Sequence, residues 1–389
     1  MLAQHEAADG WMARVRLPGG RVDAAGLEAV DDVASWGNGL IELTSRASLQ
    51  IRGLDGGASE HVADRLRAGG LLPSIAHDRV RNLLASPVAG RHPRSVAASD
   101  DVVAGLDRGL RADPALADLP ARFLFAVDDG SQTVGVQRAD VALVAERHVG
   151  FRLCLAGACT TLYAAPAGAP GLALGAARVF LEVLRDGSDG AWQVDDLSGG
   201  PGRLARCLGG ELAPSAPLAP CPLEIGVLAQ NDGRAAVTAL PPLGRVDRST
   251  VQRLATLASE VRLSTARTLT IVDVPAGDVA ALTGELRSLG LVISHGSGWQ
   301  GLSACAGLGA CTRARADVRS AASARAGVRT AGAPAEHWSA CERSCGRPVG
   351  VAVSVVASSD GLTVVTPRSA NVAGDVPDAL ALLAGCRVA

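Results

Sequence analysis

The chain has 389 residues, 48% of them hydrophobic, and a formal net charge of −2 at pH 7. This length and composition are sufficient for two or three domains, each with its own core. The lack of a basic excess excludes a general electrostatic attraction to nucleic acid, so we expect no nucleic-acid partner.

The N-terminus and the apolar runs predict neither export nor membrane insertion. The first 20 residues contain no apolar h-region and no cleavage site. No apolar run approaches the roughly 20 residues of a membrane helix, and the longest candidate, residues 349–358, is typical of a buried strand. We therefore expect no membrane partner and a cytoplasmic, reducing location, which favours metal binding by cysteine over disulfides.

The first predicted unit begins at Asp9 with the sequence DGWMARVRLPGGRVD. We expect a strand over Met12–Leu17 and then a helix with Asp23 near its N-cap. Two short strands around LIELTSRASLQI and a closing helix over about 58–69 complete the unit. This order of elements is half of a ferredoxin-like α+β fold.

A degenerate copy of this unit begins at Asp232. The tetrapeptide Gly-Arg-Val-Asp at 20–23 recurs at 244–247, preceded in both copies by Asp-Gly and Leu-Pro dipeptides. The second copy predicts a strand over Ala235–Leu240 and a closing helix over about 276–289. Each copy alone leaves a sheet face and an edge uncovered, so we expect the two to pack together about a pseudo-twofold axis.

A longer α/β stretch follows each copy, and the proline-rich sequence APSAPLAPCP separates the two halves. The expected fold class is therefore α+β. The predicted parts are a ferredoxin-like half-domain at 1–75, an α/β lobe at 76–212, a linker at 213–222, a second half-domain at 223–295 and a second α/β lobe at 296–389.

Four cysteines of the second lobe are the strongest chemical signal. Cys305 and Cys311 form a Cys-x5-Cys pair, and after 29 intervening residues Cys341 and Cys345 form a Cys-x3-Cys pair. Four thiolates can complete the ligand shell of an iron–sulfur cluster. Structural zinc is a second possibility, although its cysteine pairs are typically closer in sequence. Disulfides, or four unrelated buried thiols, are also compatible with this spacing.

Three further residues invite a chemical interpretation. Cys154 and Cys159 form a second close pair, whose position mirrors that of the cluster pair in the second lobe. We interpret it as a degenerate relic or as buried thiols, because no matching pair follows before the linker. His337 precedes Cys341 by four residues and is interpreted as a local hydrogen-bonding residue near the cluster. The seven histidines show no spacing typical of a two-histidine, one-carboxylate iron site.

The duplicated half-domains, the two lobes and the cysteine spacing together resemble the nitrite/sulfite reductase superfamily over nearly the whole chain. The resemblance implies that Cys305, Cys311, Cys341 and Cys345 bind a [4Fe–4S] cluster. In this superfamily the last thiolate also bridges to the iron of sirohaem, a tetrapyrrole held at the lobe interface.

The resemblance also implies residues for the carboxylates of the tetrapyrrole. The TSR motif points to Arg46, the VRNL motif to Arg81 and Asn82, and the LPARF motif to Arg122. Arginine suits this role because its planar guanidinium can donate two parallel hydrogen bonds to one carboxylate.

One departure from the assimilatory reductases argues against six-electron reduction of sulfite or nitrite. Those enzymes have two lysines at the third motif, where this chain has Arg122 and Leu124. The chain contains no lysine at all, since its 37 basic residues are all arginine. An arginine is a poor proton donor and a leucine cannot donate a proton.

The precorrin-3B synthase branch of the superfamily is the better resemblance, on the segments DGWMARVRLPGGRVD, IELTSRASLQIRG, VRNLLASPVAG, FLFAVDDG and HWSAC. This branch implies a monooxygenase that converts precorrin-3A to precorrin-3B with O2, by C20 hydroxylation and γ-lactone formation in cobalamin biosynthesis. It implies a [4Fe–4S] cluster, a separate mononuclear non-haem iron and an external electron donor, either NADH-linked or of the ferredoxin type. The catalytic acid or base is not identified.

Two further functions compete with this one: a sirohaem-dependent nitrite or sulfite reductase, and a non-catalytic tetrapyrrole- or cluster-binding protein. The lysine-free sequence separates the oxygenase from the reductase, whereas only activity separates either enzyme from the non-catalytic protein.

Overall fold

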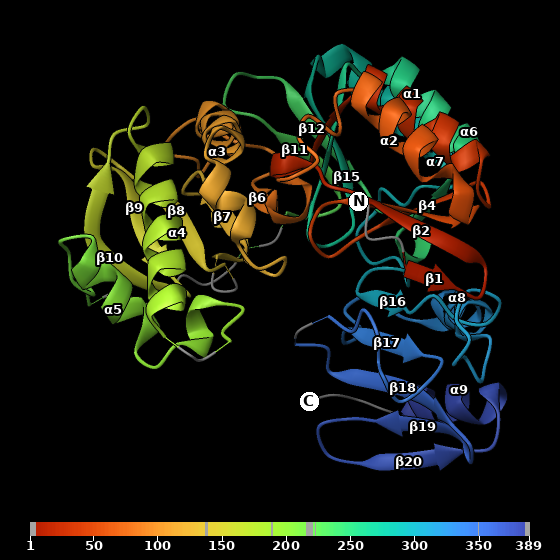
Figure 1. Cartoon of the computed structure of the whole chain (residues 1–389). Helices are drawn as coiled ribbons and strands as arrows, with labels where there is room; N and C mark the ends of the chain where they lie inside the picture. The colour runs from red at the N-terminus through yellow and green to blue at the C-terminus, as the bar shows by residue number, and fades with distance from the viewer. Residues whose placement is uncertain are drawn as a thin grey trace.

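The computed structural model describes residues 5–136, 139–187, 190–214, 221, 223–348 and 350–385. Its described strands form four five-stranded sheets. Two sheets belong to the paired half-domains, and the two lobes extend from different sides of this pair (Figure 1). No helix in the described ranges has the length and apolarity needed to cross a membrane.

Both half-domains follow the predicted order of elements, each with one further strand at its start and one short strand before its first helix. The first contains β1 (His5–Ala7), β2 (Gly10–Val15), β3 (Arg21–Asp23), α1 (Ala24–Ser35), β4 (Leu40–Leu43), β5 (Leu49–Leu54) and α2 (Ser59–Ala68). The second contains β11 (Gly226–Ala229), β12 (Ala235–Ala239), β13 (Arg245–Asp247), α6 (Arg248–Leu257), β14 (Glu260–Leu263), β15 (Leu269–Val274) and α7 (Val279–Ser288).

The repeated tetrapeptide exchanges a strand between the two half-domains. β13 pairs with β4 in the first sheet, with Val246 opposite Ile41. β3 pairs in the same way with β14 in the second sheet, with Val22 opposite Val261. Each copy thus covers an edge of the other, and α1, α2, α6 and α7 form one layer over the two sheets (Figure 1). The expected packing of the two copies is confirmed, and the exchanged strands β3 and β13 join the two sheets.

The N-cap predictions are also confirmed. The Asp23 carboxylate accepts a 2.8 Å hydrogen bond from Gly26 N at the start of α1, and Asp247 does the same for Thr250 N at the start of α6. Replacing Asp23 with Ala should therefore lower the free energy of unfolding by about 1 kcal/mol, the usual cost of a lost N-cap. A urea titration of Asp23→Ala beside Asp23→Ser, which keeps a capping oxygen, measures this. Equal stability of the Ala variant and the parent would contradict the capping role.

The two lobes share one sheet topology, in which three parallel strands are followed by two antiparallel ones. The first lobe contains β6 (Leu83–Ala85), α3 (Asp100–Ala112), β7 (Phe125–Asp128), β8 (Val141–Glu146), β9 (Gly150–Leu155), β10 (Ala158–Ala164), α4 (Ala169–Asp186) and α5 (Gly200–Cys207). The second contains β16 (Leu302–Ala304), α8 (Val318–Val328), β17 (Glu336–Ser339), β18 (Val353–Ser358), β19 (Gly361–Val365), β20 (Ala370–Ala373) and α9 (Val376–Gly385). The duplication therefore extends to the lobes. β18 is the buried strand expected within 349–358.

The interpretation of Cys154 and Cys159 as buried thiols is confirmed, whereas the shared topology shows that their position does not mirror that of the cluster pair. They lie opposite each other on β9 and β10, and both thiols are buried. The turns equivalent to those that carry the cluster cysteines follow β6 and β7 instead. There the buried Asp129 carboxylate accepts hydrogen bonds from Gly90 N at 2.7 Å and Ser131 Oγ at 2.5 Å. The close pair is thus part of the core.

A network of ion pairs holds the first lobe against the second half-domain. Arg262, 2% exposed, donates two hydrogen bonds to Asp100 of α3, at 3.0 and 2.8 Å. Arg91 joins Asp100 and Asp273 in the same network. Residues 215–220 and 222 of the predicted linker and Cys386 lie outside the described residues.

Candidate functional site

A cavity of about 690 Å³ lies where the first half-domain meets the first lobe. Its size is within the range typical of small-molecule sites. Five of the lining residues are arginines and none is a carboxylate. We call this cavity the arginine pocket. Its lining residues are Met12, Arg14, Arg16, Thr44, Ser45, Arg46, Ser48, Arg79, Asn82, Ala121, Arg122, Trp192 and Gly346.

The first half-domain supplies three of these arginines, two from one strand and one from a turn. Met12, Arg14 and Arg16 alternate along β2 and its continuation, so they share one face of the sheet. Arg46 lies on the tight turn between β4 and β5, where Ala47 adopts a φ of 50°. The Arg46 guanidinium donates to the carbonyls of Ala121 and Arg122, both at 3.3 Å, and so joins the turn to the first lobe.

Arg16 and Asn82 form the buried wall of the arginine pocket. Arg16 donates from Nη1 to Asp78 Oδ2 and from Nε to Asn82 Oδ1, both at 3.1 Å. Burial lowers the pKa of Arg16 to about 10, with Asp78 acting in the opposite direction. Asn82 Nδ2 lies within 3.0 to 3.2 Å of three main-chain oxygens. Both polar atoms of the Asn82 amide thus already have protein partners. The role of this amide is therefore to orient the neighbouring Arg16.

Arg122 and Trp192 form the open side of the pocket. The Arg122 guanidinium lies 5.9 Å from the centroid of the Trp192 ring, and Trp192 is 55% exposed. The Trp192 loop is held by Asp196 Oδ2, which accepts from Trp192 N at 2.9 Å. A large exposed aromatic ring beside arginines offers a flat apolar surface for stacking.

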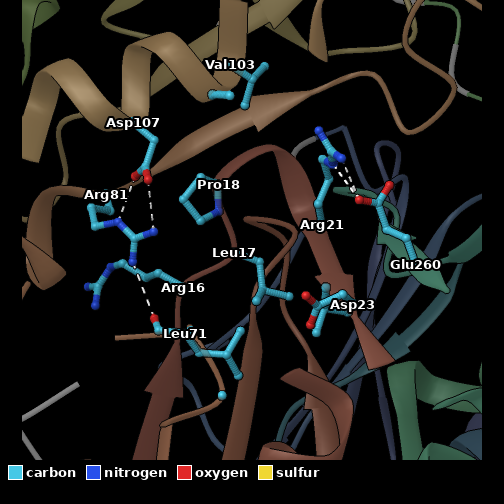
Figure 2. A pocket seen from close by; sticks show the side chains of 14 residues that line it. Arg16, Leu17, Pro18, Arg21, Asp23, Leu71, Arg81, Val103, Asp107 and Glu260 are labelled. Carbon is cyan, nitrogen blue, oxygen red and sulfur yellow. Dashed lines mark hydrogen bonds and ion pairs between the residues drawn. The ribbon is translucent and has the colours of Figure 1, made fainter. Parts of the chain in front are cut away.

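Arg81 lies outside the arginine pocket. Its Nε donates to Asp107 Oδ1 at 2.7 Å and its Nη1 to Leu71 O at 3.3 Å, beside a smaller cavity of about 280 Å³ (Figure 2). Arg81 is only 4% exposed. A role for it in carboxylate binding stays a prediction, and it would require the buried ion pair to Asp107 to open.

The structure thus brings Arg46, Asn82 and Arg122 together, as predicted from their motifs, and separates Arg81 from them. Sequence reasoning missed Arg14, Arg16, Arg79 and Trp192. The alternation of Arg14 and Arg16 in the first strand was a usable signal, because a strand places such residues on one face. Arg79 and Trp192 had no such signal, because their positions depend on how the first lobe docks.

The four cysteines of the second lobe lie on turns that follow β16 and β17. Partial burial raises the pKa of the Cys345 thiol, and the nearby Cys341, Cys305 and Cys311 all act in the same direction. These three thiols therefore lie close enough to Cys345 to act on its charge. Ala340 N donates to Cys305 Sγ at 3.2 Å and so orients that sulfur.

These cysteines fit an iron–sulfur cluster in donor type and number. In the described part of the chain, no group of three or more His, Cys, Asp or Glu side chains is arranged around a single metal ion. The thiolates of a [4Fe–4S] cluster bind four different irons, so they stand further apart than the ligands of one ion. The main-chain donor to Cys305 Sγ is the kind of hydrogen bond that tunes such clusters.

His337 is a buried hydrogen-bonding residue of β17. Its Nδ1 lies 2.8 Å from Ser303 Oγ on the neighbouring strand β16, and the side chain is fully buried. Burial lowers the pKa of His337 to about 4, and the charge of Arg267 acts in the same direction. The imidazole is therefore neutral at physiological pH, which agrees with the local role predicted for it.

Gly346 links the two sites. It lines the arginine pocket and directly follows Cys345. A ligand in the arginine pocket therefore lies beside the turn that carries the last cysteine.

Comparison with known proteins identifies the duplicated units. Residues 3–69 and 228–289 match the nitrite/sulfite reductase ferredoxin-like half domain. Both units are similar to the half-domains of this family. They lie inside the predicted half-domains, and the match accounts for the pseudo-twofold arrangement seen in the structure.

Similarity to the nitrite/sulfite reductase group extends beyond the half-domains. The chain is 26% identical to a ferredoxin–nitrite reductase of Synechococcus elongatus over 384 residues, covering 87% of this chain and 74% of the relative. It is 27% identical over 135 residues to an assimilatory ferredoxin-dependent nitrite reductase of Haloferax mediterranei, covering 32% of this chain and 23% of the relative.

The solved structure of the NirA protein of Mycobacterium tuberculosis shares the fold. Its TM-score is 0.73 at 21% sequence identity, over 91% of this chain and 74% of that one. The predicted fold class, two ferredoxin-like half-domains with two α/β lobes, is confirmed.

Proposed function

We propose that this chain is an iron–sulfur oxidoreductase that binds a polycarboxylated tetrapyrrole in the arginine pocket. The observation that carries the proposal is a pocket with five arginines and no carboxylate, bounded by the turn that carries Cys345. Cys305, Cys311, Cys341 and Cys345 would hold a [4Fe–4S] cluster. When bound, such a cluster supplies electrons one at a time.

The pocket arginines suit a ligand with several peripheral carboxylates. Arg14, Arg79 and Arg122 are exposed and make no ion pair with any described carboxylate. They are therefore free to bind a ligand, and each could donate two parallel hydrogen bonds to one carboxylate. Trp192 would stack on the macrocycle, and Arg46 would hold a carboxylate beside the Ala121 turn. This arrangement fixes the macrocycle, and orientation of this kind can contribute several kcal/mol to catalysis.

Among tetrapyrrole reactions we favour the one expected of a precorrin-3B synthase, because no lysine exists in the chain to protonate a small anion. Leu124, at the position of the second family lysine, is 6% exposed and packs in the core. In this reaction precorrin-3A is the substrate in the pocket. One oxygen atom of O2 enters the substrate and the other leaves as water, with two electrons and two protons from outside. The ring A acetate then closes the γ-lactone.

Nitrite reduction with sirohaem in the same pocket is the second candidate. The names of the two curated relatives favour it, since both are ferredoxin-dependent nitrite reductases. The same arginines would then hold the sirohaem carboxylates. Proton delivery would need water or groups other than lysine.

Absorption spectra and turnover of anaerobically purified protein test both candidates. A broad cluster band without a Soret band, together with conversion of added precorrin-3A in the presence of O2 and a donor, would support the oxygenase. A co-purified sirohaem and nitrite-dependent oxidation of reduced ferredoxin would establish the reductase instead. A protein with neither iron, sulfide nor tetrapyrrole binding would contradict the proposal as a whole.

An exposed basic surface beside the cysteines suits an acidic electron donor. A shallow depression beside Cys341 is lined by Arg313, Arg315 and Arg343. Glu342 is the one acidic residue of its lining. We propose this surface as the docking site of the external donor, because opposite charges accelerate association.

Reversing one of these charges should slow reduction by an acidic donor. For Arg343→Glu we expect the second-order rate constant to fall about tenfold at low salt, within the range of electrostatic steering. The deficit should shrink as ionic strength rises, since salt screens exposed charges. Stopped-flow reduction by a ferredoxin-type donor measures this, with Arg253→Glu on the distant helix layer as the control. A rate independent of salt in the parent protein would remove the surface from the donor path.

A further inference from the structure

Three arginines donate hydrogen bonds to main-chain carbonyls that flank the cluster cysteines. Arg52 of β5 donates to Ala310 O at 2.7 Å, immediately before Cys311. Arg319 of α8 donates to Ala306 O at 3.2 Å, immediately after Cys305. Arg267 Nη2 donates the third bond, at 3.1 Å, to the carbonyl oxygen of Gly346, the residue immediately after Cys345. We call Arg52, Arg267 and Arg319 the cysteine-loop arginines.

Two of the cysteine-loop arginines are neutralised. Arg52 forms two hydrogen bonds with the Asp9 carboxylate, at 3.0 and 2.9 Å. Arg319 pairs with Glu42 of β4 at 3.0 Å. Each joins a cysteine turn to the first half-domain through a buried charge pair. Their main contribution is therefore to position the turns.

Arg267 differs because it makes no ion pair in the part of the chain that the structure describes. Its side chain is half-buried against Gly244 and reaches the turn between Cys345 and the arginine pocket. A cation held there without an ion-pair partner acts directly on charges at the cysteines, because the surroundings screen it less than water does.

The duplication places Arg267 on a turn related to that of Arg46, although within the turn Arg267 occupies the position of Ala47. Arg267 lies on the turn between β14 and β15, which is equivalent to the turn between β4 and β5 that carries Arg46. Both turns have a residue with positive φ, 61° at Arg267 and 50° at Ala47. Arg46 reaches the first lobe and Arg267 reaches the second. One ancestral turn thus serves both the pocket and the cysteines.

We propose that the cysteine-loop arginines position the cluster turns and that Arg267 makes the cluster easier to reduce. The inference rests on the proposed binding of a cluster by the four cysteines. One-electron reduction adds one negative charge to the cluster and its thiolates. A fixed cation nearby stabilises that charge and so raises the reduction potential.

Reduction potentials of the reconstituted holoprotein test the role of Arg267. Arg267→Gln keeps an amide donor for Gly346 O and removes the charge. We expect its cluster to be about tenfold harder to reduce in a dye-coupled titration, a shift of about −59 mV for one electron. Arg267→Lys, which retains a cation, should restore most of the parent potential. Arg287→Gln on the exposed side of α7 is the control and should change nothing.

A second variant tests the positioning role. Arg319→Gln should release iron to a chelator several-fold faster than the parent, with a smaller change in potential than Arg267→Gln. The inference would be overturned if Arg267→Gln carried a full complement of cluster and kept the parent's reduction potential. Equal shifts of the reduction potential in Arg267→Gln and Arg287→Gln would also overturn it. A parent protein that assembles no cluster would instead refute the proposed function.

Discussion

Replacing Cys341 with Ser is expected to abolish assembly of the iron–sulfur cluster and to destabilise the second lobe. A serine oxygen is a hard ligand that does not substitute for a soft thiolate. Among the residues that the structure describes, the long turns that carry the cysteines contain no helix or strand between β16 and α8 or between β17 and β18. Because binding of a metal centre is coupled to folding of the segments that hold it, loss of one ligand should release these turns.

Iron and sulfide content, cluster absorbance and thermal unfolding of Cys341→Ser measure this effect. The matched control is Cys207→Ser, since Cys207 is an exposed free thiol at the end of α5 in the other lobe. The control should keep the parent's iron content and unfolding temperature. Full cluster absorbance in Cys341→Ser would remove that residue from the ligand set, and equal losses in both variants would show a general effect of thiol removal.

Much of the half-domain structure could be predicted, because its signals are local and occur twice. Strand alternation, the N-cap aspartates and the repeated dipeptides specify the order of elements in each copy. The strand exchange could not be predicted. β3 and β13 are three residues long, so they carry almost no alternation, and their partners lie in the other half of the chain.

The candidate site shows the same division between local and long-range information. Arg46 and Arg122 follow from motifs, and the structure brings them to one cavity. Arg81 belongs to an equally clear motif, but its position is decided by Asp107 of α3, 26 residues along the chain. Cys154 and Cys159 are buried as predicted, but the expectation that they mirror the cluster pair was wrong, because similar spacing in sequence does not establish equivalence in topology. Only the strand order of the lobes shows which turns correspond.

Under the proposed function, the duplicated fold would use its two interfaces for two different kinds of chemistry. In the first lobe the turns after β6 and β7 hold a buried network around Asp129, whereas in the second lobe the equivalent turns hold the cysteines. The arginine pocket lies at the first interface and is closed toward the second by Gly346. Under this proposal, one lobe would bind a large anion while the other supplies electrons.

Removing Arg46 and Arg122 together should weaken tetrapyrrole binding by about two to four orders of magnitude. A hydrogen bond to a charged group contributes about 1.5–3 kcal/mol, and each 1.4 kcal/mol is about tenfold in affinity. Both side chains are at least partly exposed, so the Arg46→Ala/Arg122→Ala variant should fold with little loss of stability. Arg16→Ala is less suitable, because it would leave the buried Asp78 carboxylate without this partner.

Titration with a polycarboxylated tetrapyrrole, followed by quenching of tryptophan fluorescence, measures the loss of affinity. Trp192 at the mouth of the pocket provides the signal, and Arg178→Ala on the outer face of α4 is the control. The weakening should shrink at high salt, because exposed charges are screened, and the cluster should stay intact in both proteins. Unchanged affinity in the double variant would move the tetrapyrrole out of the arginine pocket. Loss of affinity in the Arg178 control as well would show that general surface charge, rather than this pocket, attracts the ligand.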